Sequence, residues 1–334
     1  MNHNTHQKLP LLILLIASLL LGFTACSQKP VSKPPIKISI DVWAGYAHAF
    51  IAQEKGFFKK NGVEVQLVFE KNYTTSTGHY VNGDVDGVFE VFTDAILQRA
   101  SGNYGKVVYV VDRSTSGDVI IGRPEIKDLT ELKLKKVGVE GVNTFSHLFV
   151  MTALEKAGLK ETELRFDVVP AHDVLEALQS GKIAAGHTYE PTKSKALQAG
   201  YKILATAGDT PGIITDVLVL NDRILQERPE EVRAILKSLF EALNFETFHR
   251  EEALSIMSKA VGMDKAEMAS GLHGAKALDL IENKRAMRRD SGVESLASVG
   301  EVIANFYLER GQLSSLPDMD QVIDARFVEA LENK

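Results

Sequence analysis

Short Ile- and Val-rich runs alternate with amphipathic helical patterns along most of the chain, and this alternation constrains the fold more than any other feature. Strands that alternate with helical segments indicate βαβ units and a largely parallel sheet. The predicted strands form two series: Ile36–Val42, Val63–Phe69, Asp86–Phe89 and Lys106–Val111, then Val137–Glu140, Leu164–Val169, Ala184–Thr188 and Lys202–Thr206. The sequence therefore predicts an α/β fold built in two blocks.

The chain changes character near Glu227, after which helical patterns predominate. We expect two α/β lobes, with residues 36–117 and 222–334 in lobe one and residues 118–221 in lobe two. The chain would cross between the lobes near Ser116–Ile121 and return near Thr215–Asn221. Two crossings make a hinge, and two lobes on a hinge enclose a cleft that closes. Ligands of open α/β sheets bind outside the carboxyl ends of the strands, so residues that follow strands are the candidate binding residues.

Residues 1–25 have the pattern of a signal peptide, with a polar start, an apolar run over Leu9–Phe23 and small residues at the cleavage site. The site Phe23-Thr24-Ala25-Cys26 resembles the bacterial lipobox, with Phe where Leu is usual. Cys26 is the only cysteine, and lipidation would account for an unpaired thiol in an exported protein. We expect a cell-envelope lipoprotein, held to the membrane by Cys26 and a flexible tether over residues 26–35. The alternative is an ordinary signal peptide with an incidental cysteine.

The charges are well mixed, with 38 basic and 44 acidic residues and a net charge of −6. A nucleic-acid surface would need a clustered basic face, so we expect no nucleic-acid partner. The single cysteine excludes disulfides and a thiolate zinc cluster. The histidines show no metal-ligand spacing and are expected at the surface or as caps. We therefore expect no metal and no cofactor.

Aromatic and small residues follow the first predicted strand. Trp43 either packs in the core or forms an aromatic wall that stacks on a flat ligand or attracts a cation. Gly45 would let the backbone approach a ligand, with Tyr46 beside it.

Polar residues follow the next two predicted strands. Tyr73 and Thr74 belong to a hydroxyl-rich run that either caps a helix or holds a polar ligand group. Glu90 ends the third strand, where a buried carboxylate is costly unless something pairs with it. It either faces the cleft or has a structural partner.

In lobe two, Asn143 and Thr144 precede a helix whose N-terminal amides favour a negative or polar ligand group. Tyr189 and Glu190 follow a predicted strand, and Pro191 starts the next helix. We expect Tyr189 and Glu190 to contact ligand. Asp216, at the return crossing, is a further candidate.

Several short segments in order resemble one transporter-associated family. They are the Trp-x-Gly at Trp43, the run EKGFFKKNGVEV at 54–65, and the segments at Gly83–Gly87, Gly181–Ala185 and Tyr189–Pro191. The chain is similar to the binding proteins for aliphatic sulfonates, taurine, nitrate and thiamine pyrimidine precursors. That resemblance implies the type 2 periplasmic-binding-protein fold. It also implies that Ser114, Ser116 and Gly117 line the hinge and face ligand.

The resemblance implies a monomeric binding protein that captures a small molecule and delivers it to an ABC importer, a permease with its ATPase. An enzyme on the same fold is one alternative, either a periplasmic enzyme or one like the thiamine-pyrimidine synthase. The synthase resemblance would bring a cysteine-rich motif, which this sequence lacks. A sensor that presents ligand to a membrane receptor is the other alternative.

The charge of the strand-end loops favours one ligand class. These loops contain a single strong base, Arg113, but many acids and aromatic residues. A bare anion would need Arg, Lys and helix N-termini. Buried carboxylates need a cation or hydrogen-bond donors, and an amino group supplies both. We expect an amine-bearing ligand, with an aminopyrimidine first and a taurine-like zwitterion second.

Overall fold

The computed structural model describes residues 33–289 and 295–332. The predicted signal peptide and Cys26 lie outside the described residues, as does most of the tether. Residues Pro35–Lys334 form one compact unit. Within the part of the chain that the structure describes, no helix combines the length and apolar character needed to cross a membrane.

The first of two sheets has six strands in the order β11-β4-β10-β3-β1-β2. The strands are β1 Ile36–Ile40, β2 Val65–Phe69, β3 Gly87–Val91, β4 Gly105–Ser114, β10 Thr215–Asn221 and β11 Ala275–Ala277. β1 pairs in parallel with β2 and β3, with Ile38 opposite Leu67 and Gly87. β10 runs antiparallel between β3 and β4, so the sheet is mixed rather than wholly parallel.

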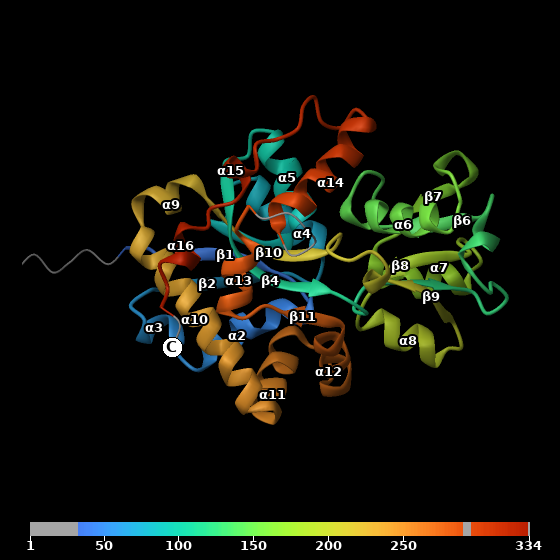
Figure 1. Cartoon of the computed structure of the whole chain (residues 1–334). Helices are drawn as coiled ribbons and strands as arrows, with labels where there is room; N and C mark the ends of the chain where they lie inside the picture. The colour runs from blue at the N-terminus through green and yellow to red at the C-terminus, as the bar shows by residue number, and fades with distance from the viewer. Residues whose placement is uncertain (1–32, 290–294, 333–334) are drawn as a thin grey trace, which may run out of the picture. The chain divides into compact units, whose positions relative to one another are not determined.

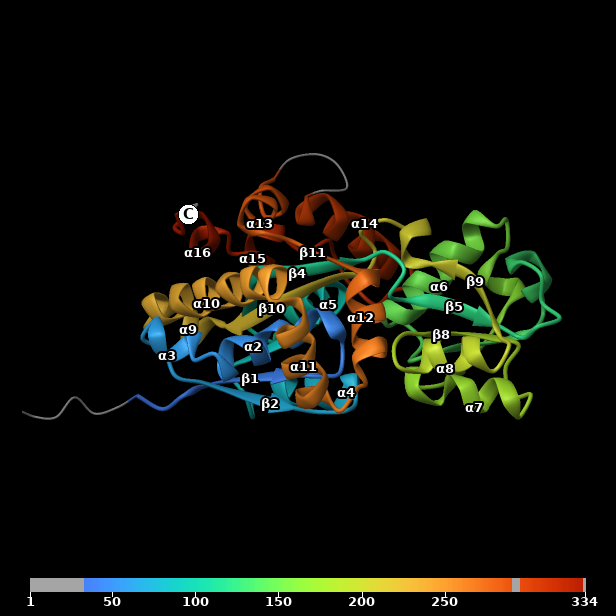
Figure 2. The ribbon, with the colours of Figure 1, turned by 90° about the horizontal axis from the view of Figure 1, so that it is seen from below.

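The second sheet has five strands in the order β7-β6-β8-β5-β9. The strands are β5 Val119–Gly122, β6 Lys136–Val139, β7 Arg165–Val168, β8 Ala185–Thr188 and β9 Lys202–Thr206. β6 pairs in parallel with β7 and β8, whereas β5 runs antiparallel to β8 and β9. Figures 1 and 2 show the two sheets side by side, each with its own helices.

The chain passes between the sheets twice, through residues 115–118 and 207–214. Both crossings come earlier than the sequence predicted. β5 lies where we expected the first crossing to end, and β10 lies where we expected the return crossing. β10 is almost entirely buried and has a neighbour on each side, so it is an interior strand of the first sheet. A strand that returns antiparallel breaks the βαβ pattern, and for this reason the pattern did not reveal it.

Helices cover both sheets. They are α2 His48–Glu54, α3 Phe57–Lys60, α4 Tyr73–Val81, α5 Phe92–Ala100, α6 Phe145–Lys156, α7 Val174–Gln179, α8 Thr192–Gln198, α9 Asp222–Glu227, α10 Pro229–Phe248, α11 Arg250–Val261, α12 Lys265–Gly274, α13 Leu280–Ala286, α14 Leu296–Glu309, α15 Met319–Val322 and α16 Arg326–Glu329. α10 begins with Pro229 in its first turn, and its buried face includes Val232, Ile235, Leu236 and Leu239. The run of helices from α10 onward agrees with the helical patterns that predominate in the sequence after Glu227.

The end of α12 lies against the first crossing. The carbonyl oxygen of Gly274 accepts hydrogen bonds from the backbone N–H groups of Thr115 at 2.8 Å, Ser116 at 3.2 Å and Gly117 at 3.1 Å. A side chain at Gly274 would overlap the backbone of Gly117, so only glycine allows this approach. The C-terminal third of the chain therefore supports the first crossing between the sheets as well as the first sheet.

Candidate ligand-binding cleft

Two adjoining pockets lie at the carboxyl ends of strands from both sheets. The outer pocket is lined by residues that follow β1, β2, β6, β7 and β8, namely Val42, Lys71, Asn72, Tyr73, Thr74, Glu140, Pro170, Ala171, His172, Tyr189, Glu190, Pro191 and Thr192. This is the edge at which open α/β sheets bind their ligands. Both pockets therefore lie at the edge of the sheets at which the strand-end rule predicts a site.

The inner pocket is lined by Asp41, Trp43, Tyr46, Tyr73, Val91, Asp118, Phe145, Tyr189, Ile214 and Asp216. These residues enclose about 260 Å³ of free space, including the part open to solvent. Tyr73 and Tyr189 line both pockets, so they stand between the outer and inner spaces. Among the described residues that line the inner pocket, the charged side chains are all carboxylates.

Trp43 is fixed in place by contacts on several sides. Its Nε1 donates to Asp112 Oδ2 at 3.1 Å, and its ring meets Tyr189 edge-on at a centroid distance of 5.7 Å. A Cβ at Gly45 would overlap Asp112 Oδ2, and a Cβ at Gly117 would lie 2.5 Å from the Trp43 ring. Both glycines are therefore needed for this position of the indole, which is buried but lines the inner pocket.

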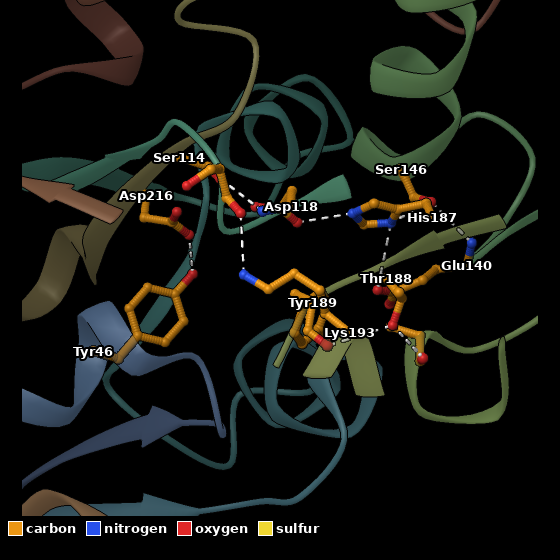
Figure 3. A network of polar contacts seen from close by, with 12 residues as sticks. Tyr46, Ser114, Asp118, Glu140, Ser146, His187, Thr188, Tyr189, Lys193 and Asp216 are labelled. Carbon is orange, nitrogen blue, oxygen red and sulfur yellow. Dashed lines mark hydrogen bonds and ion pairs between the residues drawn. The ribbon is translucent and has the colours of Figure 1, made fainter. Parts of the chain in front are cut away.

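Asp112 and Asp216 form a buried pair of acids beside Trp43. They lie opposite each other on β4 and β10, and a hydrogen bond joins their side chains. The Tyr46 hydroxyl donates to Asp216 Oδ1 (Figure 3). Burial raises the pKa of Asp112 to about 7, with the charge of Asp118 adding to it. Burial, and next the charge of Asp112, hold the pKa of Asp216 well above its ordinary value. Burial and mutual repulsion therefore favour a protonated carboxyl in this pair.

His187 on β8 lies beside two further acids, Asp118 and Glu140. Its Nε2 lies 2.8 Å from Asp118 Oδ1, and its Nδ1 lies 2.9 Å from Ser146 Oγ (Figure 3). The Ser114 hydroxyl accepts a hydrogen bond from Asp118 N at 3.0 Å. Glu140 Oε1 lies 4.0 Å from His187 Nδ1. Burial raises the pKa of Glu140 to about 7, against the opposing effect of His187.

Two further acids lie beside these residues, Asp41 in the lining of the inner pocket and Asp94 against Tyr73. Asp41 Oδ1 accepts from Trp43 N at 2.7 Å, and burial raises the pKa of Asp41 to about 7 despite this bond. Tyr73 donates its hydroxyl to Asp94 and accepts from Val91 N at 3.1 Å, while its ring meets Phe145 at 5.2 Å. Burial raises the pKa of Asp94 to about 6. Tyr73 begins α4, which packs on the first sheet, and Phe145 begins α6, which packs on the second, so this ring contact joins the two sides of the cleft.

Glu190 connects the two sheets at the cleft rim. Its carboxylate accepts from Ser194 Oγ at 3.0 Å and from Ser270 Oγ on α12 at 2.7 Å, and it pairs with Lys193 Nζ at 3.2 Å. Lys193 also donates to the carbonyl oxygen of Ser116 at 3.1 Å. Glu190 lines the outer pocket, but its oxygens already have protein partners. It therefore joins α8 to α12 and to the hinge.

The structure brings most of the sequence-predicted residues to the cleft. Trp43, Tyr46, Tyr73, Tyr189 and Asp216 line the inner pocket, and Thr74 and Glu190 line the outer one. Gly45, Ser114 and Gly117 lie directly behind these residues. Ser116 contributes its backbone to the hinge contacts.

Three predicted residues lie apart from the lining of both pockets. Glu90 faces α5, where its Oε2 accepts from Gln98 at 2.6 Å, because neighbouring residues on β3 point to opposite faces. Asn143 N donates to His147 Nδ1 at 3.1 Å, and Thr144 Oγ1 donates to Gly141 O at 2.8 Å. Asn143 and Thr144 shape the turn that leads into α6.

Sequence reasoning missed Asp41 and His187. Asp41 directly follows β1, so its position after a strand was a usable signal. His187 was expected at the surface or as a cap, but it is fully buried within β8. Its flanking apolar strand residues were the only available sign of burial.

The fold is the periplasmic-binding-protein fold, as the solved structures similar to this chain show. The aliphatic sulphonate binding protein SsuA from Escherichia coli superposes with a TM-score of 0.71 at 19% identity, over 87% of this chain and 98% of that chain. The nitrate-binding protein NrtA from Synechocystis superposes with a TM-score of 0.70 at 15% identity, over 88% and 86%.

Sequence comparison identifies the family. The family model described as NMT1/THI5 like matches residues 43–253, and the chain belongs to this family. A protein of Brucella abortus described as a binding protein is 26% identical over 84% of this chain and 87% of its own length. The yeast 4-amino-5-hydroxymethyl-2-methylpyrimidine phosphate synthase THI13 is 26% identical over 59% of this chain and 62% of its own length.

Proposed function

We propose that this protein is an extracytoplasmic solute-binding protein that captures a small polar organic molecule in the cleft and delivers it to an ABC importer. The observation that carries the proposal is a set of buried carboxylate oxygens at the cleft that have no hydrogen-bond partner among the described residues. They are Asp41 Oδ2, Asp118 Oδ2 and Glu140 Oε1, each on a residue that lines one of the two pockets. Buried polar atoms in native proteins are nearly always bonded, so such atoms at a pocket mark the place of a ligand.

The mechanism that we propose is capture by closure. One lobe would be built on the first sheet and the other on the second, with residues 115–118 and 207–214 as the hinge. Asp41, Asp112 and Asp216 come from the first lobe, and Glu140 from the second, so both walls contribute acids. A ligand that bonds to both walls favours the closed form by the free energy of the contacts made only there. The closed form then docks on the permease.

The ligand that fits this lining is an amine-bearing molecule, with an aminopyrimidine first and a taurine-like zwitterion second. A cationic nitrogen supplies both the charge and the donors that buried carboxylates require. Trp43, Tyr73 and Tyr189 add aromatic faces and edges suited to a flat ring or a cation. The pyrimidine product named for the yeast relatives is consistent with this class.

A calorimetric and thermal-shift screen tests the proposal. The panel contains aminopyrimidines, taurine, alkanesulfonates and nitrate, and we expect binding of an amine-bearing compound. Asp216→Asn should weaken that binding by at least tenfold, because the amide places a hydrogen-bond donor where the inner pocket has a carboxyl oxygen. Tight binding of an alkanesulfonate or nitrate, without a response to any amine-bearing compound, would contradict the ligand class. A chain that binds none of the panel would argue against the solute-binding role.

A synthase is the second candidate function, because the chain matches yeast synthases over 218 residues. A synthase would form the pyrimidine phosphate, so the test is whether the purified protein produces that compound when incubated with a small-molecule cell extract. Production above the level of a heat-inactivated control would favour the synthase, whereas reversible binding of a pyrimidine without production would favour transport.

We also propose that the protein is exported and anchored through a lipid on Cys26. The support is the signal-peptide pattern and the absence of another cysteine. Labelling with a radioactive fatty acid tests the modification, and fractionation tests the location.

A further inference from the structure

The hydrogen-bond donors around the inner pocket are already bonded to carboxylates. Trp43 Nε1 donates to Asp112, the Tyr46 hydroxyl to Asp216 and the Tyr73 hydroxyl to Asp94. A ligand group that only accepts hydrogen bonds therefore finds no uncommitted side-chain donor among Trp43, Tyr46 and Tyr73.

The carboxylate acceptors of the inner pocket, in contrast, are only partly used by the protein. Asp41 and Asp118 each hold one oxygen in a protein hydrogen bond, to Trp43 N and to His187 Nε2. The other oxygen of each carboxylate, Oδ2 in both residues, is buried and has no partner in the described part of the chain. Both residues line the inner pocket and are at most 2% exposed. Each of these two buried side chains therefore keeps one oxygen that can accept a hydrogen bond from a ligand.

Glu140 adds a third acceptor that a ligand can reach from the same side. Its Oε1 is buried without a hydrogen-bond partner in the described residues, and the residue lines the outer pocket beside Tyr189. Tyr189 lines both pockets, so it has Glu140 on one side and Asp41 and Asp118 on the other. The unpartnered acceptors of both pockets therefore lie around Tyr189.

The walls around this position favour a flat group. Trp43 and Tyr189 meet at an interplanar angle of 86°, and Tyr73 and Phe145 meet at 65°. The free space of about 260 Å³ leaves room only for a small head group. A planar cation can lie against an aromatic face while its N–H groups point outward in the plane.

We infer that the buried end of the ligand is a planar cation that carries only donors, of the amidinium or guanidinium class, and this inference rests on the proposed solute-binding function. Such a group has N–H donors spread around a plane and no acceptor. It therefore matches the unpartnered carboxylate oxygens around Tyr189 and the protein donors that are already bonded to acids. A primary ammonium directs three donors within a narrow cone from one nitrogen. A sulfonate has acceptors only and meets carboxylates. An aminopyrimidine fits when its ring is protonated, because the protonated edge then has the donor pattern of an amidinium.

Three aromatic probes of matched shape test the inference: benzamidine, benzylamine and benzenesulfonate. Binding is followed by calorimetry and by the fluorescence of Trp43, the single tryptophan of the chain. We expect benzamidine to bind at least tenfold more tightly than benzylamine, and benzenesulfonate not to alter the Trp43 signal. Asp118→Asn should weaken benzamidine binding by at least tenfold. The control Glu54→Gln changes an exposed acid of α2 and should leave it unchanged.

Benzylamine binding as tight as benzamidine, or tighter, would overturn the planar class. A response of Trp43 to benzenesulfonate would overturn the donor-only requirement while leaving the solute-binding role intact. No binding of any of the three probes would also overturn the inference, since the wider solute screen decides the binding role separately. Circular dichroism of Asp118→Asn shows whether the variant is folded. If it is not, Asp41→Asn serves as the second variant with the same expected loss.

Discussion

Replacing Asp41 with Asn should make the ligand-free protein more stable at pH 8 and weaken its binding of a cationic ligand. Asp41 is 1% exposed, and its pKa is raised from 3.8 to about 7, chiefly by burial. The folded form therefore holds a proton between about pH 4 and 7, whereas the unfolded form has released it. A carboxyl group whose pKa is raised by folding stabilises the fold less as the pH increases through this window.

The size of the stability change in Asp41→Asn follows from the pKa shift of Asp41. Each pKa unit corresponds to about 1.4 kcal/mol, so a shift of about three units costs at most ~4 kcal/mol above pH 7. The neighbouring acids share this cost, and we expect about 2 kcal/mol to be recovered in Asp41→Asn at pH 8. The amide keeps the Oδ1 acceptor for Trp43 N, so the loop after β1 retains its hydrogen bond. Near pH 4.5 the variant and the unaltered protein should unfold alike.

Denaturant unfolding at pH 4.5, 6 and 8 measures this difference directly. Glu54→Gln is the control, because it removes an exposed acid and should show no such pH dependence. The reasoning fails if Asp41→Asn is less stable than the unaltered protein at pH 8, or if the difference between them is the same at all three pH values.

Four further outcomes are expected. Gly117→Ala should weaken ligand binding by at least tenfold in calorimetry, because the added methyl group displaces the Trp43 ring; an unchanged affinity would contradict the contact. Glu90→Gln should change the ligand affinity by no more than twofold, because this side chain faces α5. A tenfold loss of affinity would indicate that Glu90 contacts the ligand. Ser270→Ala should raise the ligand dissociation rate a few-fold in stopped-flow measurements by removing one bond to Glu190, and an unaltered rate would argue against this contact in closure. Cys26→Ser should release the protein from membranes after fractionation, and retention of the variant would argue against lipidation.

The sequence predicted the parallel part of each sheet because those strands are apolar runs that alternate with helices. It did not reveal β10, although Thr215–Asn221 contains an apolar run, because a strand that inserts between β3 and β4 follows no local pattern. The position of α12 against the first crossing was also invisible, since it depends on contacts between Gly274 and residues about 160 positions earlier.

The candidate site was predicted where chemistry and strand position coincide. Trp43, Tyr73 and Tyr189 follow strands and line the cleft, as the strand-end rule suggests. His187 could not be assigned, because its partners Ser146 and Asp118 lie 41 and 69 residues away. Glu90 also ends a strand, but its side chain lies away from the cleft. Neighbouring residues on a strand point to opposite faces of the sheet, so position after a strand alone does not decide which face a side chain takes.

The carbonyl group of Gly274 has a mechanical consequence. Three successive amides of the first crossing bond to this one oxygen, and Ala207 and Gly208 of the second crossing bond to Asp118 and Thr115. The two crossings and the end of α12 therefore form a braced pivot. If the second lobe rotates relative to the first, the rotation axis should pass close to this braced pivot. The extent of the rotation should then depend on backbone torsion angles at the two ends of the pivot. Loosening the brace at Gly274 would change how far the lobe travels and how fast it returns, while leaving the walls of the pocket chemically the same.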